Sequence, residues 1–540
     1  MIIAAQLAEL LVGLGIRRVY GLPGEDHMAL LDSLQAAGLE YTTAFNESSA
    51  VLMAATDAQL TGLPGVAVLS LAPGVSNGVN GLLNTYLDQI PLLVISGQHP
   101  AGRLPFVVRQ GFDIERLVAP ITKWQARITA DMDLPAVIGK AVDEAMSGRP
   151  GPVYLELPDA VATADATAST TDQTVAALRS RWVEPARPAT TTDVTGLAAR
   201  IAGARHPALV VGGRRRLVEP ATVAEFAAAH RMPVFTTSRQ KGLLGSDFPF
   251  FAGTFLNGRL ERNLLDHSDL VLMVNPESFD YYNKAWCFDA DAIALVDPSF
   301  TEWLNPFTER HVVDPDAVLR DLTAHSAGSA SVWTPQDVRD YRTTLRASLV
   351  PADASTFSVA HAVAAALDAW PQDGYLVADA GFGKPLVAML SDPAVPDHYL
   401  ASNALSTMGY AIPATVAARR AVDGPILTFL GDGSLLMRAT ELMVSPQDTT
   451  PSVLVALMDR SLTQIEVKQE RRGLAPVGAA LPPVWCAKLA DAFGIDGMDV
   501  TDADELRAAV AKGLRGDRPL LIGAHIDPAP SRDLFDLLRG

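Results

Sequence analysis

The sequence predicts an α/β protein that consists of three doubly wound domains, each built around a parallel β-sheet. Short apolar runs recur along the chain, and each is followed by a turn that contains glycine or proline and then by a helical pattern. Strands that alternate with helices in this way form parallel sheets, because each helix returns the chain to the end where the next strand begins. The first and last parts of the chain also follow the same plan of strands and helices.

Two segments of distinct composition divide the chain, and the first of them lacks clear periodicity. Residues 160–190 are rich in alanine, threonine and aspartate, and residues 329–355 contain serine, threonine and proline. Both are predicted to be linkers. The expected domains are therefore residues 1–160, 188–328 and 356–540, which agrees with the two to four domains that a chain of 540 residues allows.

Each domain is expected to begin with its own strand–turn–helix units. The first has predicted strands at Arg18–Tyr20, Tyr41–Phe45, Gly65–Leu69 and Pro91–Gly97, after an opening helix at about Ala4–Leu14. The second has predicted strands at Ala208–Val211, Pro233–Phe235, Leu270–Val274 and Ala292–Val296. The third opens with a helix at Val359–Trp370 and continues with strands at Tyr375–Ala378, Ile426–Leu430, Val453–Met458 and Leu520–Ala524.

Composition excludes several classes of protein. The net charge of −18 argues against nucleic-acid binding, which uses basic patches, and no apolar run is long enough for a membrane span. Cys287 and Cys486 are far apart, so neither a disulfide framework nor a cysteine metal site is expected. The first residues lack the basic region of a signal peptide. We expect a cytoplasmic protein without membrane or nucleic-acid partners.

The stretch from Ile426 to Leu462 is predicted to place two carboxylates and a glycine-containing turn at one edge of a sheet. One apolar run ends in Gly431-Asp432-Gly433-Ser434, and the next ends in Asp459. Carboxyl ends of parallel strands are where ligands bind in such sheets, and the glycines and the helix N-terminus suit a phosphate. Two carboxylates with a diphosphate would satisfy Mg²⁺. The alternative is that the glycines form only a turn.

A second candidate is Glu47, which follows the predicted strand Tyr41–Phe45 and enters a helix of small residues. Desolvation at such a position would suit a carboxyl group for proton transfer. A glutamate at a helix N-terminus can equally have a structural role, because the helix dipole stabilises its charge.

These pieces together resemble the thiamine diphosphate-dependent 2-oxo acid enzymes, the group of acetolactate synthase, pyruvate decarboxylase and benzoylformate decarboxylase. The matching segments occur in the order of that family along nearly the whole chain, and Asp432 and Asp459 have the separation that its metal–diphosphate motif requires. The segments are Gly21-Leu22-Pro23-Gly24, Asn46-Glu47, Ala72-Pro73-Gly74-Val75-Ser76-Asn77, Tyr86-Leu87-Asp88-Gln89-Ile90-Pro91, Ser406-Thr407-Met408-Gly409-Tyr410 and Gly431-Asp432-Gly433-Ser434.

The resemblance implies a role for each segment. The three domains would be an aminopyrimidine-binding (PYR), a central and a diphosphate-binding (PP) domain. Glu47 would hydrogen-bond the pyrimidine ring and promote loss of the thiazolium C2 proton, while Met408, otherwise a core residue, would hold the cofactor folded. The Ser406 carbonyl would accept from its amino group. Further cofactor contacts would come from Pro23, Asn77, Gly381, Gly433 and Ser434, and Mg²⁺ would be held by Asp432, Asp459 and the Ser461 carbonyl.

The departures from the family favour one reaction. The second metal ligand is usually asparagine, and here it is Asp459. The paired histidines of pyruvate decarboxylases are missing, and Ile465 stands where those enzymes have a carboxylate. The segment around Gln110 resembles that of acetolactate synthases, although Gln110 could be a surface residue. We therefore expect a carboligase that decarboxylates a 2-oxo acid and transfers the acyl unit to a second carbonyl.

Alternatives remain within and outside enzymes. A simple 2-oxo acid decarboxylase or a cyclic 1,2-diketone hydrolase would use the same cofactor, and a degenerate binding protein would have lost Glu47 or the carboxylates. FAD in the central domain is compatible with the resemblance but not required by it. A homodimer or homotetramer with the active site between subunits is implied. Candidates that face the substrate, or else have structural roles, are Glu25, Asp26, His27, which could relay protons, Phe382 and Gln464.

Overall fold

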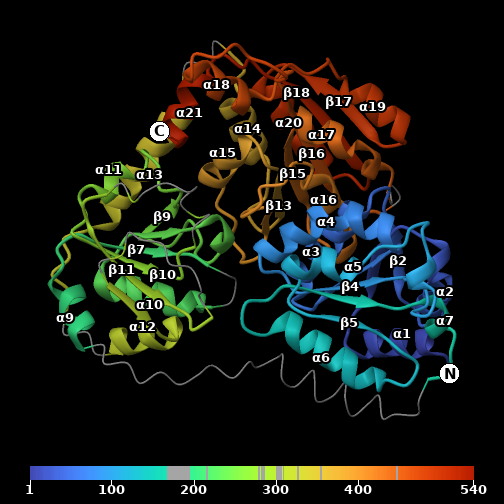
Figure 1. Cartoon of the computed structure of the whole chain (residues 1–540). Helices are drawn as coiled ribbons and strands as arrows, with labels where there is room; N and C mark the ends of the chain where they lie inside the picture. The colour runs from blue at the N-terminus through green and yellow to red at the C-terminus, as the bar shows by residue number, and fades with distance from the viewer. Residues whose placement is uncertain are drawn as a thin grey trace. The chain divides into compact units, whose positions relative to one another are not determined.

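The computed structural model describes residues 1–166, 195–213, 217–277, 280, 286, 288–299, 307, 309–324, 328–352, 356–444 and 448–539. Its contacts divide the chain into two units. The first comprises Met1–Ala186, Ala404–Asp423 and Arg438–Asp448, and the second comprises Arg187–Asn403, Gly424–Met437 and Thr449–Gly540. Three six-stranded sheets, all parallel, confirm the predicted α/β fold class (Figure 1).

The first unit contains one sheet with strand order β2-β1-β3-β4-β6-β5. The strands are β1 (Arg18–Gly21), β2 (Glu40–Thr43), β3 (Gly65–Leu69), β4 (Leu92–Ser96), β5 (Gln125–Arg127) and β6 (Pro152–Glu156). The helices are α1 (Ile3–Gly13), η1 (Glu25–His27), α2 (Met28–Ala36), α3 (Glu47–Thr61), α4 (Ala72–Leu87), η2 (Leu104–Phe106), α5 (Ile114–Val118), η3 (Ala119–Ile121), α6 (Leu134–Met146), α7 (Asp159–Ala162), α16 (Ala411–Ala421) and η6 (Ala439–Met443).

Helix α3 is the centre of this unit. Its residues from Glu47 to Ala58 are all buried, because β3, α4 and α16 pack around it. An amphipathic helix exposes one face to solvent. Helix α3 has small residues on all faces, so neighbouring elements can pack against it on every side. The N-terminus of α3, where Glu47 lies, is therefore held firmly from several directions.

The second unit contains the other two sheets. The central sheet has the order β12-β11-β10-β7-β8-β9. Its strands are β7 (Pro207–Val211), β8 (Val234–Thr236), β9 (Phe251–Thr254), β10 (Leu270–Val274), β11 (Asp291–Val296) and β12 (Glu309–Val312). The accompanying helices are α9 (Thr195–Gly203), α10 (Pro220–His230), η4 (Ser238–Gln240), α11 (Arg262–Leu265), α12 (Pro315–Ala324) and α13 (Pro335–Leu349).

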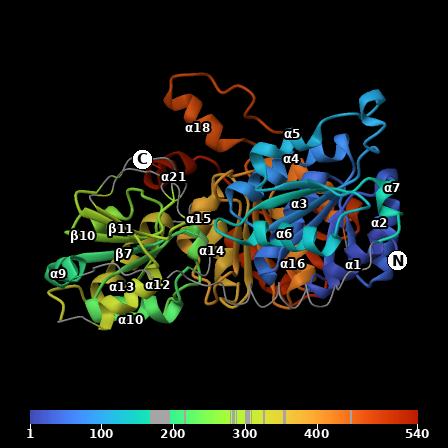
Figure 2. The same ribbon diagram turned by 60° about the horizontal axis from the view of Figure 1, so that its bottom comes forward.

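The third sheet has the order β14-β13-β15-β16-β18-β17, which repeats that of the first sheet strand for strand. Its strands are β13 (Tyr375–Ala378), β14 (Tyr399–Ala401), β15 (Ile426–Gly431), β16 (Ser452–Met458), β17 (Asp496–Val500) and β18 (Pro519–His525). The helices are α14 (Val359–Asp368), α15 (Gly383–Leu390), α17 (Asp432–Arg438), α18 (Thr463–Arg471), α19 (Cys486–Phe493), α20 (Ala503–Gly513) and α21 (Ser531–Arg539). Both views show α18 beside α21 (Figure 2).

The predicted linker at residues 329–355 is largely helical. This segment contains the four-turn helix α13, which begins with a capping box between Thr334 and Asp337. Its apolar residues Val338, Tyr341, Leu345 and Leu349 recur at helical spacing and are buried. Serine, threonine and proline at the helix start had hidden this pattern. The predicted linker at 160–190 lies mostly outside the described residues, and Cys287 lies outside them as well.

Among the helices that the structure describes, none is both long and apolar enough to cross a membrane.

Candidate cofactor site

The third sheet brings the two predicted carboxylates to one edge. Strands β15 and β16 are parallel neighbours in register, and Asp432 and Asp459 follow directly after their carboxyl ends. The amide of Arg460 donates to Asp432 Oδ2 at 2.8 Å, so the turn after β16 is fastened to the first residue of α17. The amide of Gly433 donates to the other oxygen, Oδ1, at 2.8 Å.

The charges of the two carboxylates are unfavourable in this position. Asp432 is only 3% exposed, and burial, together with the nearby charge of Asp459, raises its pKa to about 6. Burial also raises the pKa of Asp459, although a hydrogen bond from Thr463 opposes this effect. A buried and a partly buried carboxylate that repel each other are a donor set that a divalent cation would stabilise.

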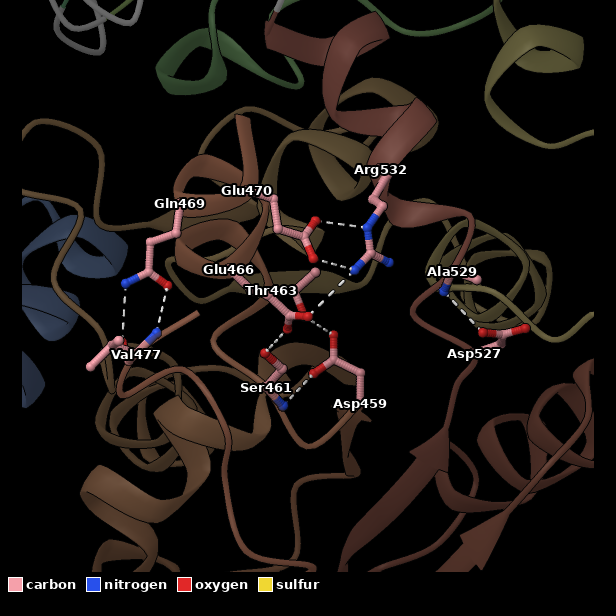
Figure 3. A network of polar contacts seen from close by, with 10 residues as sticks. All are labelled: Asp459, Ser461, Thr463, Glu466, Gln469, Glu470, Val477, Asp527, Ala529 and Arg532. Carbon is pink, nitrogen blue, oxygen red and sulfur yellow. Dashed lines mark hydrogen bonds and ion pairs between the residues drawn. The ribbon is translucent and has the colours of Figure 1, made fainter. Parts of the chain in front are cut away.

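A polar network fixes Asp459 in its orientation (Figure 3). The amide of Ser461 donates to Asp459 Oδ1 at 3.1 Å, and the Thr463 hydroxyl donates to Oδ2. The Ser461 hydroxyl in turn donates to Glu466 on α18. Arg532 of α21 binds Glu470 through two hydrogen bonds of 2.7 and 2.9 Å, and also reaches Glu466. Both helices thus support the loop that carries Asp459 and Ser461.

The neighbouring strand β13 adds a carboxylate that sequence reasoning missed. Asp379 follows β13 and accepts a hydrogen bond of 2.9 Å from the hydroxyl of Ser434, and both side chains are buried. Its position directly after an apolar run was a usable signal. Gly381 follows with φ of +138°, a conformation that favours glycine. Phe382 stacks on Phe535 of α21, and Gln464 is half-buried on α18.

The first unit holds Glu47 at the first position of α3. Asn46 is the N-cap, and its side chain accepts from the Ser48 amide at 2.9 Å. The amide group of Asn77 donates to Glu47 Oε2. The Ser48 hydroxyl donates to the Asn77 carbonyl at 2.8 Å, which ties α4 to the start of α3. The structure therefore brings Glu47 and Asn77 together, and leaves Glu47 9% exposed.

The turn before α2 is held by the residues that were candidates for facing the substrate. The Gly24 amide donates to His27 Nε2 at 3.1 Å, which places the ring proton on Nδ1. Asp26 accepts from the Leu71 amide at 2.8 Å. Burial alone would raise the pKa of Asp26, but its contacts with His27 and this amide lower it. His27 is buried and Asp26 mostly so, whereas Pro23 and Glu25 are exposed.

The segment with Ser406 and Met408 belongs to the same unit as Glu47. It is fastened to α4 by two hydrogen bonds of 2.8 Å, from the Thr407 hydroxyl to Asn80 and from the Ala404 amide to Asp88. Ser406 is exposed with φ of +52°, and Met408 is half-buried. The structure thus brings the Met408 segment to the helix that carries Asn77.

Gln110 lies elsewhere on this unit, on an exposed segment. It has φ of +58°, and its apolar neighbours Phe106, Val108 and Phe112 are 84%, 95% and 55% exposed. Exposure of three large apolar side chains so close in sequence is unusual.

Comparison with known families supplies the identification. Three family models match the chain in order: the N-terminal TPP-binding domain of thiamine pyrophosphate enzymes at residues 1–117, their central domain at 194–322 and their C-terminal TPP-binding domain at 379–524. The chain belongs to the thiamine pyrophosphate enzyme family. The expectation of an enzyme is confirmed over the alternative of a degenerate binding protein, and thiamine diphosphate is the cofactor that the two TPP-binding domains support.

Relatives of this thiamine pyrophosphate enzyme carry out different reactions. The large subunit of acetolactate synthase isozyme 2 from Escherichia coli is 28% identical over 95% of this chain and 93% of its own length. A probable 2-ketoarginine decarboxylase from Pseudomonas aeruginosa is 29% identical, over 94% and 91%. Oxalyl-CoA decarboxylase from E. coli is 26% identical, over 97% and 94%. The family is therefore that of thiamine diphosphate-dependent 2-oxo acid enzymes, with both synthases and decarboxylases among the relatives.

Proposed function

We propose that this enzyme decarboxylates a 2-oxo acid and transfers the acyl unit to a second carbonyl, which would make it a carboligase like the acetolactate synthases that it resembles. The observation that carries this proposal is the buried Glu47 carboxylate, which Asn77 holds at the N-terminus of α3. When bound, thiamine diphosphate would supply a nucleophilic carbon that adds to a carbonyl. Glu47 would hydrogen-bond a nitrogen of its pyrimidine ring and hold a proton there.

The other residues of the first unit would orient the cofactor. Met408 would pack against it, and the Ser406 carbonyl would accept from its amino group. The turn at Pro23, held by His27 through Gly24, and the side chain of Asn77 would contact the cofactor from the domain that carries Glu47. His27 would then act by holding the turn, since its Nε2 already accepts from a backbone amide.

We further propose that Mg²⁺ binds at Asp432 and Asp459, with the Ser461 carbonyl as a third ligand. The described residues contain no group of three or more histidine, cysteine, aspartate or glutamate side chains placed to hold a metal. That agrees with Mg²⁺, which commonly takes one or two carboxylates and completes its shell with phosphate and water. Gly433 and Ser434 at the start of α17 would contact the diphosphate.

Binding of Mg²⁺ is expected to depend on pH. Because the pKa of Asp432 is raised to about 6, protons compete with the cation below this value. Mg²⁺ affinity should fall by about tenfold between pH 6.5 and 5 in titrations by calorimetry. In the cofactor-free protein, the contribution of Asp432 to stability should change in the opposite direction, being largest below about pH 4 and falling as the carboxyl group ionises toward pH 6. An affinity that is flat from pH 5 to 7 would contradict the assignment.

FAD does not enter this proposal. The order of the central sheet is one that binds dinucleotides, at the crevice beside Gly212. In this chain Asp280 covers that glycine, since a Cβ placed there would lie 3.0 Å from Asp280 Oδ2. Glu277 is buried alongside, and burial raises the pKa of Asp280 to about 7. Although Arg239 lies 3.5 Å from Glu277, these acidic side chains make the crevice a less favourable place for a diphosphate.

Product analysis separates the carboligase from its alternatives. With thiamine diphosphate, Mg²⁺ and pyruvate, a carboligase should release carbon dioxide and an acyloin-type acid, whereas a simple decarboxylase should release free aldehyde. The decarboxylases among the relatives support the second outcome. The exposed Ile465, where pyruvate decarboxylases have a carboxylate, supports the first. Turnover of a cyclic 1,2-diketone instead of pyruvate would identify the hydrolase.

We also propose a homodimer or homotetramer with the active site between subunits. The exposed side chains of Phe106, Val108 and Phe112 support this assembly, because a second copy could cover them. Gln110 lies between these apolar residues and would then reach the site of the neighbouring subunit.

A further inference from the structure

The orientation of the Glu47 side chain depends on the backbone that precedes it. As the first residue of α3, it has no preceding helical turn to fix it, and its direction follows from the N-cap Asn46. Asn77 holds one carboxylate oxygen from α4. A carboxyl group that must meet a ring nitrogen at hydrogen-bond distance needs the cap to be fixed as well.

Arg438, at the end of α17, supplies that support from a part of the chain that is distant in sequence. Its Nη1 donates to Asn46 Oδ1 at 2.8 Å and to the Ser49 hydroxyl at 2.6 Å. These two residues flank Glu47 within one helical turn, and neither hydrogen bond involves Glu47 itself. Asn46 Oδ1 thus accepts both from Arg438 and from the Ser48 amide, so the guanidinium and the cap share one oxygen.

A carboxylate one turn further along completes the clamp. Glu441, which is fully buried, accepts from the Phe45 amide at 3.1 Å. Arg438 and Glu441 together therefore hold backbone and side chains from Phe45 to Ser49, on both sides of Glu47. Hydrogen bonds to charged groups in buried surroundings are stronger and more directional than neutral ones.

The stem of Arg438 also contacts the segment that follows Met408. Gly409 has φ of +79°, and a Cβ there would lie 2.6 Å from Arg438 Cγ. The arginine consequently lies against the turn after Met408 while its guanidinium reaches the start of α3. One side chain therefore touches both the turn after Met408 and the start of α3.

We propose that Arg438 is a positioning residue that fixes the orientation of Glu47. This inference rests on the proposed role of Glu47. The substitution Arg438→Met tests it, because methionine keeps an apolar stem against Gly409 and removes every donor. Arg438→Lys keeps a single charged donor. Arg472→Met, at an exposed position on the far end of α18, is the matched control.

The first measurement uses the protein without cofactor. Amide hydrogen exchange at residues 48–50 should become about tenfold faster in Arg438→Met, intermediate in Arg438→Lys and unchanged in Arg472→Met. Thermal unfolding and exchange in β15 and β16 report whether the variant is folded. Unchanged exchange at residues 48–50 in a folded Arg438→Met protein would overturn the proposal.

The second measurement uses the protein with thiamine diphosphate and Mg²⁺. Exchange of the C2 proton of the bound cofactor with solvent should slow by about tenfold or more in Arg438→Met, while cofactor affinity changes less than about threefold. Affinity and proton exchange that fall in parallel would instead show a role in binding and overturn the proposal. If the wild-type protein binds no thiamine diphosphate, the proposed function fails, whereas the amide measurement still tests the clamp.

Discussion

Replacing Glu47 by glutamine should lower the turnover rate by about 10²–10⁴-fold, while the protein still binds thiamine diphosphate and Mg²⁺. Glutamine has the same shape and can keep the contact with Asn77, but it cannot hold the proton that the carboxyl group shares with the pyrimidine ring. Affinity should stay within about threefold, because the diphosphate and the cation bind to other residues. Steady-state turnover of pyruvate and calorimetry of cofactor binding measure the two quantities.

Glu505→Gln is the matched control for this substitution. Glu505 also lies in the first turn of a helix, α20, but it is exposed. Its replacement should leave turnover unchanged. If Glu47→Gln retained more than about a third of the wild-type rate, the carboxyl group would have no part in proton transfer.

Asp432→Asn should weaken the binding of thiamine diphosphate and Mg²⁺, and it should stabilise the protein that holds neither of them (the empty protein). Asparagine lacks the charge that a cation needs, so Mg²⁺-dependent binding of thiamine diphosphate should weaken by about 100-fold. The empty protein should become more stable at pH 7, because the ionised carboxylate is an unfavourable group in this place. A pKa raised from 3.8 to about 6 corresponds to about 3 kcal/mol at neutral pH.

Part of this increase in stability should be lost, because the asparagine side chain has only one oxygen to accept hydrogen bonds from the amides of Gly433 and Arg460. We expect a net increase in unfolding free energy of about 1–2 kcal/mol for the empty protein in urea titrations at pH 7, and no increase at pH 4. Asp496→Asn, on the exposed end of β17, should change neither quantity. A loss of stability at pH 7 would mean that the two carboxylates do not repel each other.

Sequence patterns were sufficient where a feature depends on residues close together in the chain. The runs that form β15 and β16 are continuous apolar segments of parallel strands, and their carboxyl ends necessarily share an edge once the strands pair. The proximity of Asp432 and Asp459 therefore follows from the order of their segments alone. Helix α13 was missed although it is local, because its polar start concealed the capping box at Thr334.

Contacts between distant segments could not be found in this way. Nothing around Arg438 indicates that its side chain reaches Asn46, since the two are nearly 400 positions apart and join only when the helices pack. Likewise, the orientation of His27 toward the Gly24 amide depends on the fold of a turn. Sequence reasoning named His27 for its chemistry, and only the geometry shows what its ring nitrogen holds.

The packing of α3 has a consequence for the protein while it is being synthesised. The apolar cluster around Val51 and Ala54 is closed by Val416, Ala417 and Val444. The ribosome adds these residues roughly 350 positions after α3, which takes roughly 20–70 s at 5–20 residues per second. Throughout that interval an apolar surface beside Glu47 has no cover. The nascent chain is thus most exposed to aggregation long after its first sheet is complete, and a chaperone that binds apolar segments would be most useful then.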